Sequence, residues 1–322
     1  MTKYKIGILF FTAFIIGITS GLLIRNTRGI NTEYTEKHSG QKRLTNKLLD
    51  FDIPPSNELG DYKNKLEQIV DTNMANKNAT RISVYYRDLN NGPWVGLYEE
   101  EKFIPASLLK IPLMMIYYKN AEKKPSILKK KYKFIPGEFN QYSVTQHYDP
   151  KVDLEEGKEY TVEELIERMI VYSDNNALFI LASHADPDEQ RELFTELGFK
   201  LPSELNASAQ FVSVRNIGSF FRVLYNATYL NEEMSEKALQ LLTKTDFKKG
   251  ITAGVPSDVT VAQKYGERDD NGIMELHDCG IVYFPNHPYI ICIMTQGTNY
   301  EKLSNVIKDI SSLTYEKVKR AN

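Results

Sequence analysis

The chain of 322 residues is long enough for one large domain or two ordinary ones, and its 42% hydrophobic residues can supply a core. Its 40 Lys and Arg residues nearly balance 42 Asp and Glu residues, so the net charge of -2 gives no electrostatic reason to expect a nucleic-acid partner. The scattered histidines and the two cysteines match no zinc-binding spacing, and no glycine-rich phosphate loop is present, so we expect no metal and no cofactor.

Residues 1–28 are typical of a membrane anchor. The run from Ile6 to Ile24 has no charge and is flanked by lysines before it and arginines after it. At about 1.5 Å per residue, this run nearly spans a hydrocarbon core of roughly 30 Å. A cleaved signal peptide and a buried core helix are the alternatives, but the length and the terminal position favour an uncleaved anchor. The nearly symmetric flanking charge does not fix its orientation.

Residues 29–57 are polar and charged, a composition that cannot bury enough surface to order itself. We interpret them as a linker that lifts the body of the protein off the membrane. The rest of the chain, residues 58–322, is expected to form one domain. Its first part predicts a helix at 66–74, where apolar residues recur with a helical period, and a hairpin at 82–97.

The middle of the chain is predominantly helical. Nearly continuous apolar residues after Ser107 predict a buried helix that opens at this serine. Thr161 and Glu164 form a capping box, so a second helix is expected to begin there and to end near Tyr172. Further helical patterns follow, and we expect residues 121–245 to form an inserted all-helical subdomain.

Strand signals return only late in the chain, and an amphipathic helix at 303–313 ends it. This order predicts an α+β fold in which both chain ends build one antiparallel sheet, packed with helices. The expected late strands are residues 259–264, 279–284 and 290–295.

Cys279 and Cys292, the only cysteines, fall on two strands that we expect to be neighbours. A bridge between them is geometrically feasible. A single pair is too few for a disulfide-stapled scaffold, and we expect two unlinked buried thiols.

Three short motifs have residue types that can support acyl transfer. Ser107 and Lys110 are spaced three apart at a helix start, which places a hydroxyl and an amine on one face. An amine that burial keeps neutral can take the hydroxyl proton, and the N–H groups of the helix start suit a developing oxyanion. Alone, this spacing also arises by chance in structural helices.

The other two motifs are Ser173-Asp174-Asn175, where the second helix ends, and Lys264-Tyr265-Gly266, at the expected end of a strand. The first can relay a proton and bind an amide, yet the same residues form ordinary turns and N-caps. The second can present a cation and an open backbone edge to an extended anionic substrate, or be a surface lysine before a hairpin glycine.

The order and spacing of the three motifs resemble those of the class A β-lactamases and related penicillin-binding serine hydrolases, whose signature is SxxK, SDN and Lys-Thr/Ser-Gly. The matching stretches are PASLLKIPLM, YSDNNALFIL and VAQKYGE, and the resemblance runs from about residue 60 to the end. It implies a β-lactamase/transpeptidase-like fold. It also implies that a substrate carbonyl acylates Ser107, that Lys110 is the base and that Ser173 passes the proton to the leaving nitrogen.

The resemblance implies substrate-binding roles as well. Asn175 would hold Lys110 and the substrate amide, Lys264 would attract a substrate carboxylate, and Gly266 would leave the strand edge open. The N–H groups of Ser107 and Glu267 would form the oxyanion hole. The expected substrate is a β-lactam or a D-amino-acid peptide of the cell wall, met by a domain outside the cytoplasm on a single-pass protein of the cell membrane.

Two positions depart from the family pattern. Tyr265 stands where the family has Thr or Ser, which removes the small hydroxyl that helps the lysine bind a carboxylate. In PSELN, Pro202 stands where class A β-lactamases have the glutamate that activates the deacylating water. Glu204 is either a displaced substitute or a solvated loop carboxylate.

These departures leave three function classes open. The first is an active serine hydrolase of the β-lactamase or D-Ala-D-Ala carboxypeptidase type. The second is a penicillin- or peptidoglycan-binding sensor with an impaired site, and the third is a structural membrane protein. We expect the first, with slow release of the acyl group.

Overall fold

The computed structural model describes residues 59–90, 92–137, 146–148, 153–197, 199 and 209–321. The expected anchor (1–28), the expected linker (29–57) and residues 202–206 lie outside these ranges. Within the ranges described, none of the helices combines the length and the hydropathy that a bilayer crossing requires.

A five-stranded antiparallel sheet forms the centre of the domain, in the order β2-β1-β7-β6-β5. The pairing of β1 with β7, from Arg81 opposite Gln296 to Asp88 opposite Tyr289, joins the two ends of the chain and confirms the expected sheet. The strands are β1 (Arg81–Asp88), β2 (Trp94–Leu97), β5 (Val261–Asp270), β6 (Ile273–Val282) and β7 (Tyr289–Gly297).

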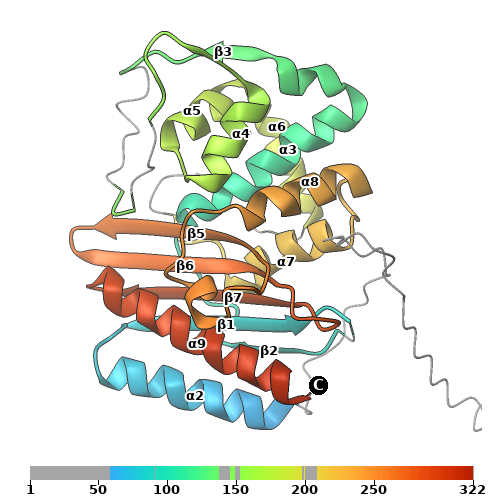
Figure 1. Cartoon of the computed structure of the whole chain (residues 1–322). Helices are drawn as coiled ribbons and strands as arrows, with labels where there is room; N and C mark the ends of the chain where they lie inside the picture. The colour runs from blue at the N-terminus through green and yellow to red at the C-terminus, as the bar shows by residue number, and fades with distance from the viewer. Residues whose placement is uncertain are drawn as a thin grey trace, which may run out of the picture. The chain divides into compact units, whose positions relative to one another are not determined.

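Two helices, α2 (Gly60–Ala75) and α9 (Tyr300–Ala321), cover one face of the sheet (Figure 1). Their apolar stripes are buried against the strands because residues three and four apart share one helix face. The two helices are also tied to each other, since Tyr62 Oη lies 2.7 Å from Thr314 Oγ1 in a buried hydrogen bond.

The other face of the sheet carries the helical part of the domain (Figure 1). Helix α3 is buried along most of its length, as its continuous apolar sequence predicts, and the capping box of Thr161 and Glu164 begins α4. A small two-stranded sheet of β3 (Lys131–Lys133) and β4 (Glu159–Thr161) lies beside these helices, so the subdomain expected at residues 121–245 is mainly helical and not all-helical. The helices are α3 (Lys110–Lys123), α4 (Val162–Val171), α5 (Asn175–His184), α6 (Pro187–Glu196), α7 (Val214–Tyr225) and α8 (Glu232–Thr243).

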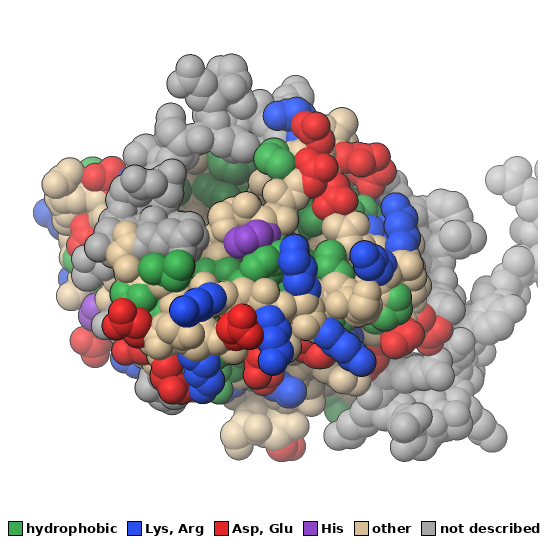
Figure 2. Space-filling model, turned by 90° about the horizontal axis from the view of Figure 1, so that it is seen from above, with side chains coloured by type: hydrophobic (Ala, Val, Ile, Leu, Met, Phe, Trp, Pro, Cys, Tyr) green, Lys and Arg blue, Asp and Glu red, His purple; other side chains and the backbone are tan. Residues whose placement is uncertain are grey.

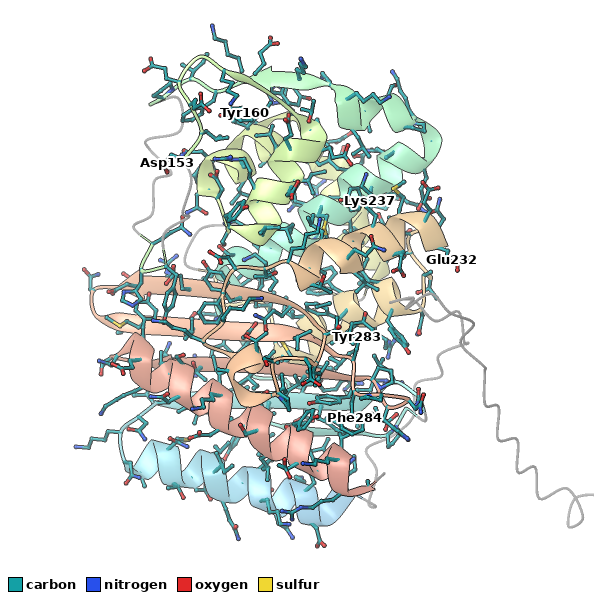
Figure 3. The ribbon with its side chains drawn as sticks, in the orientation of Figure 1. Asp153, Tyr160, Glu232, Lys237, Tyr283 and Phe284 are labelled. Atoms are coloured by element: carbon teal, nitrogen blue, oxygen red, sulfur yellow. A yellow bond between two sulfur atoms is a disulfide. The ribbon has the colours of Figure 1, made fainter. Side chains whose placement is uncertain are left out.

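Two consecutive residues after β6 show how the chain contributes to both sides of the sheet. Tyr283 lies against Tyr225 of α7, and Phe284 lies against Tyr315 of α9 (Figure 3). On the surface drawn in Figure 2, basic and acidic side chains are interspersed, which agrees with a net charge near zero.

The motif Lys264-Tyr265-Gly266 lies within β5 and not at the end of a strand, which corrects one expectation. β5 continues to Asp270, and β6 begins at Ile273. The turn between them is Asn271-Gly272, with φ of 53° and 85°, the left-handed backbone that a tight hairpin requires. A longer β5 places Glu267 inside the sheet, opposite Leu276 of β6.

Cys279 and Cys292 form a disulfide, which shows that the expectation of two unlinked thiols was wrong. The two residues are direct cross-strand partners of β6 and β7, and both are fully buried. The register of β6 against β7 explains the bond, because directly opposite residues of an antiparallel pair bring their Cβ atoms close enough for a disulfide.

The disulfide predicts a specific alkylation pattern. Iodoacetamide should add no mass to the denatured, non-reduced chain and should modify both cysteines after reduction, because a bonded pair has no thiolate to alkylate. Intact-mass spectra measure this. Modification of both cysteines before reduction would contradict the bond.

Candidate active site

Ser107 lies in a 3₁₀ turn, Ala106–Leu109, that leads directly into α3. The residue before it, Ala106, has φ of 46°, a left-handed conformation that costs a non-glycine residue roughly 1–2 kcal/mol. Ser107 is partly exposed, and its hydroxyl makes no hydrogen bond to any described residue. The turn therefore presents a hydroxyl that a substrate can reach.

Two contacts hold the segment that leads to this turn. His277 is fully buried in β6, and its Nε2 donates to Ile104 O at 3.0 Å. The preceding residue, Phe103, forms a β-bridge with Val212. Sequence reasoning missed His277, because a lone histidine within an apolar strand gives no local signal.

Gly266 lets β5 approach the turn closely. A Cβ at this position would lie 3.2 Å from both Pro105 O and Ser107 N, and 3.3 Å from Leu108 Cγ. These distances are shorter than ordinary van der Waals contact, and two of the three atoms belong to the backbone. Only glycine leaves this space open, so the strand edge lies directly against the amide of Ser107.

Lys110 is the first residue of α3, and its side chain is fully buried. Its Nζ donates to Ser173 O at 2.6 Å and to Asn175 Oδ1 at 2.7 Å, and lies 3.1 Å from Ser173 Oγ. The second motif therefore holds the amine, one helical turn after Ser107.

The turn between α4 and α5 supplies Ser173 and Asn175. Ser173 is fully buried with φ of 57°, a second strained residue at the site. Asp174 has a structural role, because its carboxylate caps α5 by accepting from Asn176 N and Ala177 N at 2.8 and 3.1 Å. Arg168 Nε also donates to this carboxylate, which fixes the turn from the side of α4.

Lys264 of β5 reaches the same serine from the opposite side. Its Nζ donates to Ser173 Oγ at 3.0 Å and to Tyr265 O at 2.9 Å, and the side chain is fully buried. Ser173 Oγ therefore lies between two lysine amines, Lys110 at 3.1 Å and Lys264 at 3.0 Å.

Burial controls the charge of both lysines. It is the largest cause that holds the pKa of Lys110 well below its ordinary 10.5, and the neighbouring cation Lys264 lowers this pKa further. Burial also lowers the pKa of Lys264 to about 7, against the opposing effect of Asp278 and Glu267. The site thus favours the neutral amine at Lys110 more than water does at an ordinary lysine.

A segment that contacts β5 contains two further residues near the site that sequence reasoning also missed. Tyr148 N donates to Glu267 Oε1 at 2.9 Å, and Tyr265 Oη donates to Tyr148 O at 3.2 Å. Gln146 Nε2 donates to Ser173 O at 3.3 Å. Tyr148 and Gln146 belong to a segment without a repeating pattern, so only tertiary packing reveals that they lie at the site.

The structure brings the expected site residues together, with one qualification for Glu267. Its side chain is buried and bonded to Tyr148, while its backbone follows Gly266 along β5. In the described ranges, no group of His, Cys, Asp and Glu has the arrangement of a metal site. The residues that gather around Ser173 are Lys110, Asn175 and Lys264, with Ser107 and Gly266 beside them.

The family model described as the beta-lactamase enzyme family matches residues 63–318. The chain belongs to this family. Its α+β fold, with one antiparallel sheet and helices on both faces, is the fold of beta-lactamases. No curated protein sequence matches the chain.

Solved structures similar to this chain include PBP-A and several beta-lactamases. A mutant of PBP-A, solved as an acyl-enzyme complex with penicillin G, has 20% identity and a TM-score of 0.70, over 83% of this chain and 100% of that one. TLA-3 extended-spectrum beta-lactamase has 18% identity and a TM-score of 0.70, over 80% and 99%. A beta-lactamase from Chitinophaga pinensis has 20% identity and a TM-score of 0.67, over 79% and 99%. At this identity, the likeness shows the fold.

The close approach of Gly266 predicts the effect of an added methyl group. Gly266→Ala should displace the Ser107 amide and destabilise the protein by about 1–3 kcal/mol. Urea unfolding measures this loss in the free energy of unfolding. The control is Gly60→Ala, where a Cβ meets nothing within 4 Å. Equal stability of Gly266→Ala and wild type would contradict the close approach of β5 to this amide.

Proposed function

We propose that this protein is a serine hydrolase that β-lactams or D-amino-acid cell-wall peptides acylate at Ser107. The observation that supports this most strongly is the pair of buried lysines on either side of Ser173 Oγ, one turn from a reachable serine. We also propose that residues 1–28 anchor the protein in the cell membrane, with the domain outside the cytoplasm.

The first chemical step is attack of Ser107 Oγ on the substrate carbonyl carbon, with the Ser107 proton moving to neutral Lys110. A neutral amine has two N–H groups and one lone pair. In the resting site, the backbone carbonyl of Ser173 and the side-chain carbonyl of Asn175 accept the two N–H groups, and Ser173 Oγ lies 3.1 Å from the same nitrogen. Ser173 Oγ must therefore give up the lone pair before Ser107 can pass its proton to the amine. Burial lowers the pKa of Lys110, which favours the neutral form that carries this lone pair.

The second step breaks the C–N bond of the substrate. Ser173 receives the proton from Lys110 on its Oγ and gives its own hydroxyl proton to the departing nitrogen, so proton and charge balance. Lys264, which donates to the same Oγ, orients this hydroxyl. The N–H groups of Ser107 and Glu267 stabilise the oxyanion, a role that the close contact of β5 with the Ser107 amide supports.

Release of the acyl group is expected to be slow. The family's deacylating glutamate is replaced by Pro202, so water in the acyl-enzyme lacks that base. This substitution also favours the second candidate function, a penicillin- or peptidoglycan-binding sensor that remains acylated. The two functions share the acylation chemistry and differ only in the lifetime of the acyl-enzyme.

Acylation is predicted to add the mass of one penicillin to the full-length chain. The adduct should form slowly, persist after free penicillin is removed and be absent in Ser107→Ala. The control Ser219→Ala, on α7, should react like wild type, because within the described part of the chain that hydroxyl bonds only to Arg215 O of the same helix. Intact-mass spectra over time measure formation and release separately. An adduct that survives in Ser107→Ala, or rapid turnover of a chromogenic cephalosporin, would contradict this prediction.

The lysine pair also predicts the pH dependence of acylation. The rate should rise with pH as Lys110 loses its proton and level off well below pH 10.5, because the folded protein lowers the pKa of Lys110. Lys264→Met removes the neighbouring cation, which raises the pKa of Lys110 and moves the midpoint of this rise to higher pH.

The matched control for this profile is Lys237→Met on the surface of α8 (Figure 3). Its midpoint should equal that of wild type, because Lys237 pairs with Glu163 and has no contact with the site. A midpoint that stays unchanged or moves to lower pH in Lys264→Met would contradict the coupling between the two lysines.

A further inference from the structure

Tyr265 covers the ammonium group of Lys264. The Nζ atom of Lys264 lies 4.2 Å from the centre of the Tyr265 ring, within the range of a cation–π contact. The ring is only 3% exposed and stacks on Phe247 with 4.3 Å between ring centres. Its hydroxyl donates to Tyr148 O at 3.2 Å, which fixes the far end of the ring.

The contacts of Lys264 leave no position for a substrate carboxylate. An ammonium has three N–H groups. Two of them donate to Ser173 Oγ and to Tyr265 O, and the Tyr265 ring, with its centre 4.2 Å from the same nitrogen, takes up space beside the third. A carboxylate could reach the charge only by displacing one of these partners, and Lys264 is fully buried.

The surrounding charges also disfavour an anion. Glu267, two residues after Tyr265 on β5, and Asp278, opposite Tyr265 on β6, both act on Lys264 electrostatically. Burial raises the pKa of Asp278 to about 7, so Glu267 is the more constant negative charge. Glu267 also acts on the phenol of Tyr265, as does Asp246. A substrate carboxylate brought to Lys264 would therefore also come close to these carboxyl groups. Their negative charge would repel it and would offset part of its attraction to the lysine.

We propose that Tyr265 is a specificity-determining residue, and that it makes the site select acyl donors without a carboxylate beside the scissile amide. The chemical class is a neutral ester or amide, such as a peptide whose C-terminal carboxyl is amidated or continues as a further peptide bond. This inference rests on the proposed acylation of Ser107. It goes further by naming which substrates the site prefers and which side chain excludes the others.

A comparison of benzylpenicillin with its methyl ester tests the preference directly. The two compounds share the reacting carbonyl and differ in the carboxylate. In the full-length wild type, we expect Ser107 to be acylated by the methyl ester at least as fast as by the free acid. Tyr265→Thr uncovers Lys264, and its ratio of rates should shift toward the free acid by on the order of tenfold.

Tyr265→Phe is the matched variant, because it keeps the ring over Lys264 and removes only the hydroxyl. It should retain the preference for the methyl ester. Thermal unfolding of each variant shows whether it is folded, and the wild-type ratio decides the question even if Tyr265→Thr fails to fold.

The outcomes separate this inference from the proposed function. A wild type that favours the free acid by about tenfold or more overturns the selectivity and leaves the acylation chemistry intact. An unchanged ratio in folded Tyr265→Thr also overturns it. Absence of any Ser107 adduct with both compounds in every variant overturns the proposed function, and the selectivity with it.

Discussion

Two buried amino groups meet at one hydroxyl in this protein, and water cannot solvate both as cations. Lys110 Nζ and Lys264 Nζ lie 3.1 and 3.0 Å from Ser173 Oγ. Burial lowers the pKa of both amines, and the neighbouring Lys264 lowers the pKa of Lys110 further, which favours a neutral amine there. The acid–base chemistry proposed for Ser107 depends on that neutral amine. The three residues lie on separate elements: Lys110 on α3, Lys264 on β5 and Ser173 on the turn between α4 and α5.

The backbone around this hydroxyl is strained where the chemistry requires it. Ala106 and Ser173 both have positive φ, a conformation that persists only when the surrounding structure holds it. The Asp174 cap and the His277 bond to Ile104 supply that support. Gly266 contributes because it has no side chain, since a Cβ there would crowd the Ser107 amide. Stability and reactivity therefore depend on the same few contacts.

Much of the fold follows from local sequence patterns, whereas the finer features of the site depend on tertiary packing. Helical period and the capping box at Thr161 predict α2, α4 and α9, because these signals act within a few residues. The three motifs predict that Ser107, Ser173 and Lys264 meet. Strand register, which no local pattern sets, decides the Cys279–Cys292 bond, and the place of Tyr265 over Lys264 appears only once the strand is folded.

The chemistry proposed for Ser107 depends most directly on the lowered pKa of Lys110. Nuclear magnetic resonance of the full-length protein with labelled lysines, assigned by Lys110→Met, follows the Cε and Nζ shifts of this residue against pH. Lys110 should titrate well below the ordinary lysine pKa of 10.5, because burial and Lys264 both disfavour its charged form. A Lys110 signal that remains in the ammonium form until pH 10 or above would contradict it.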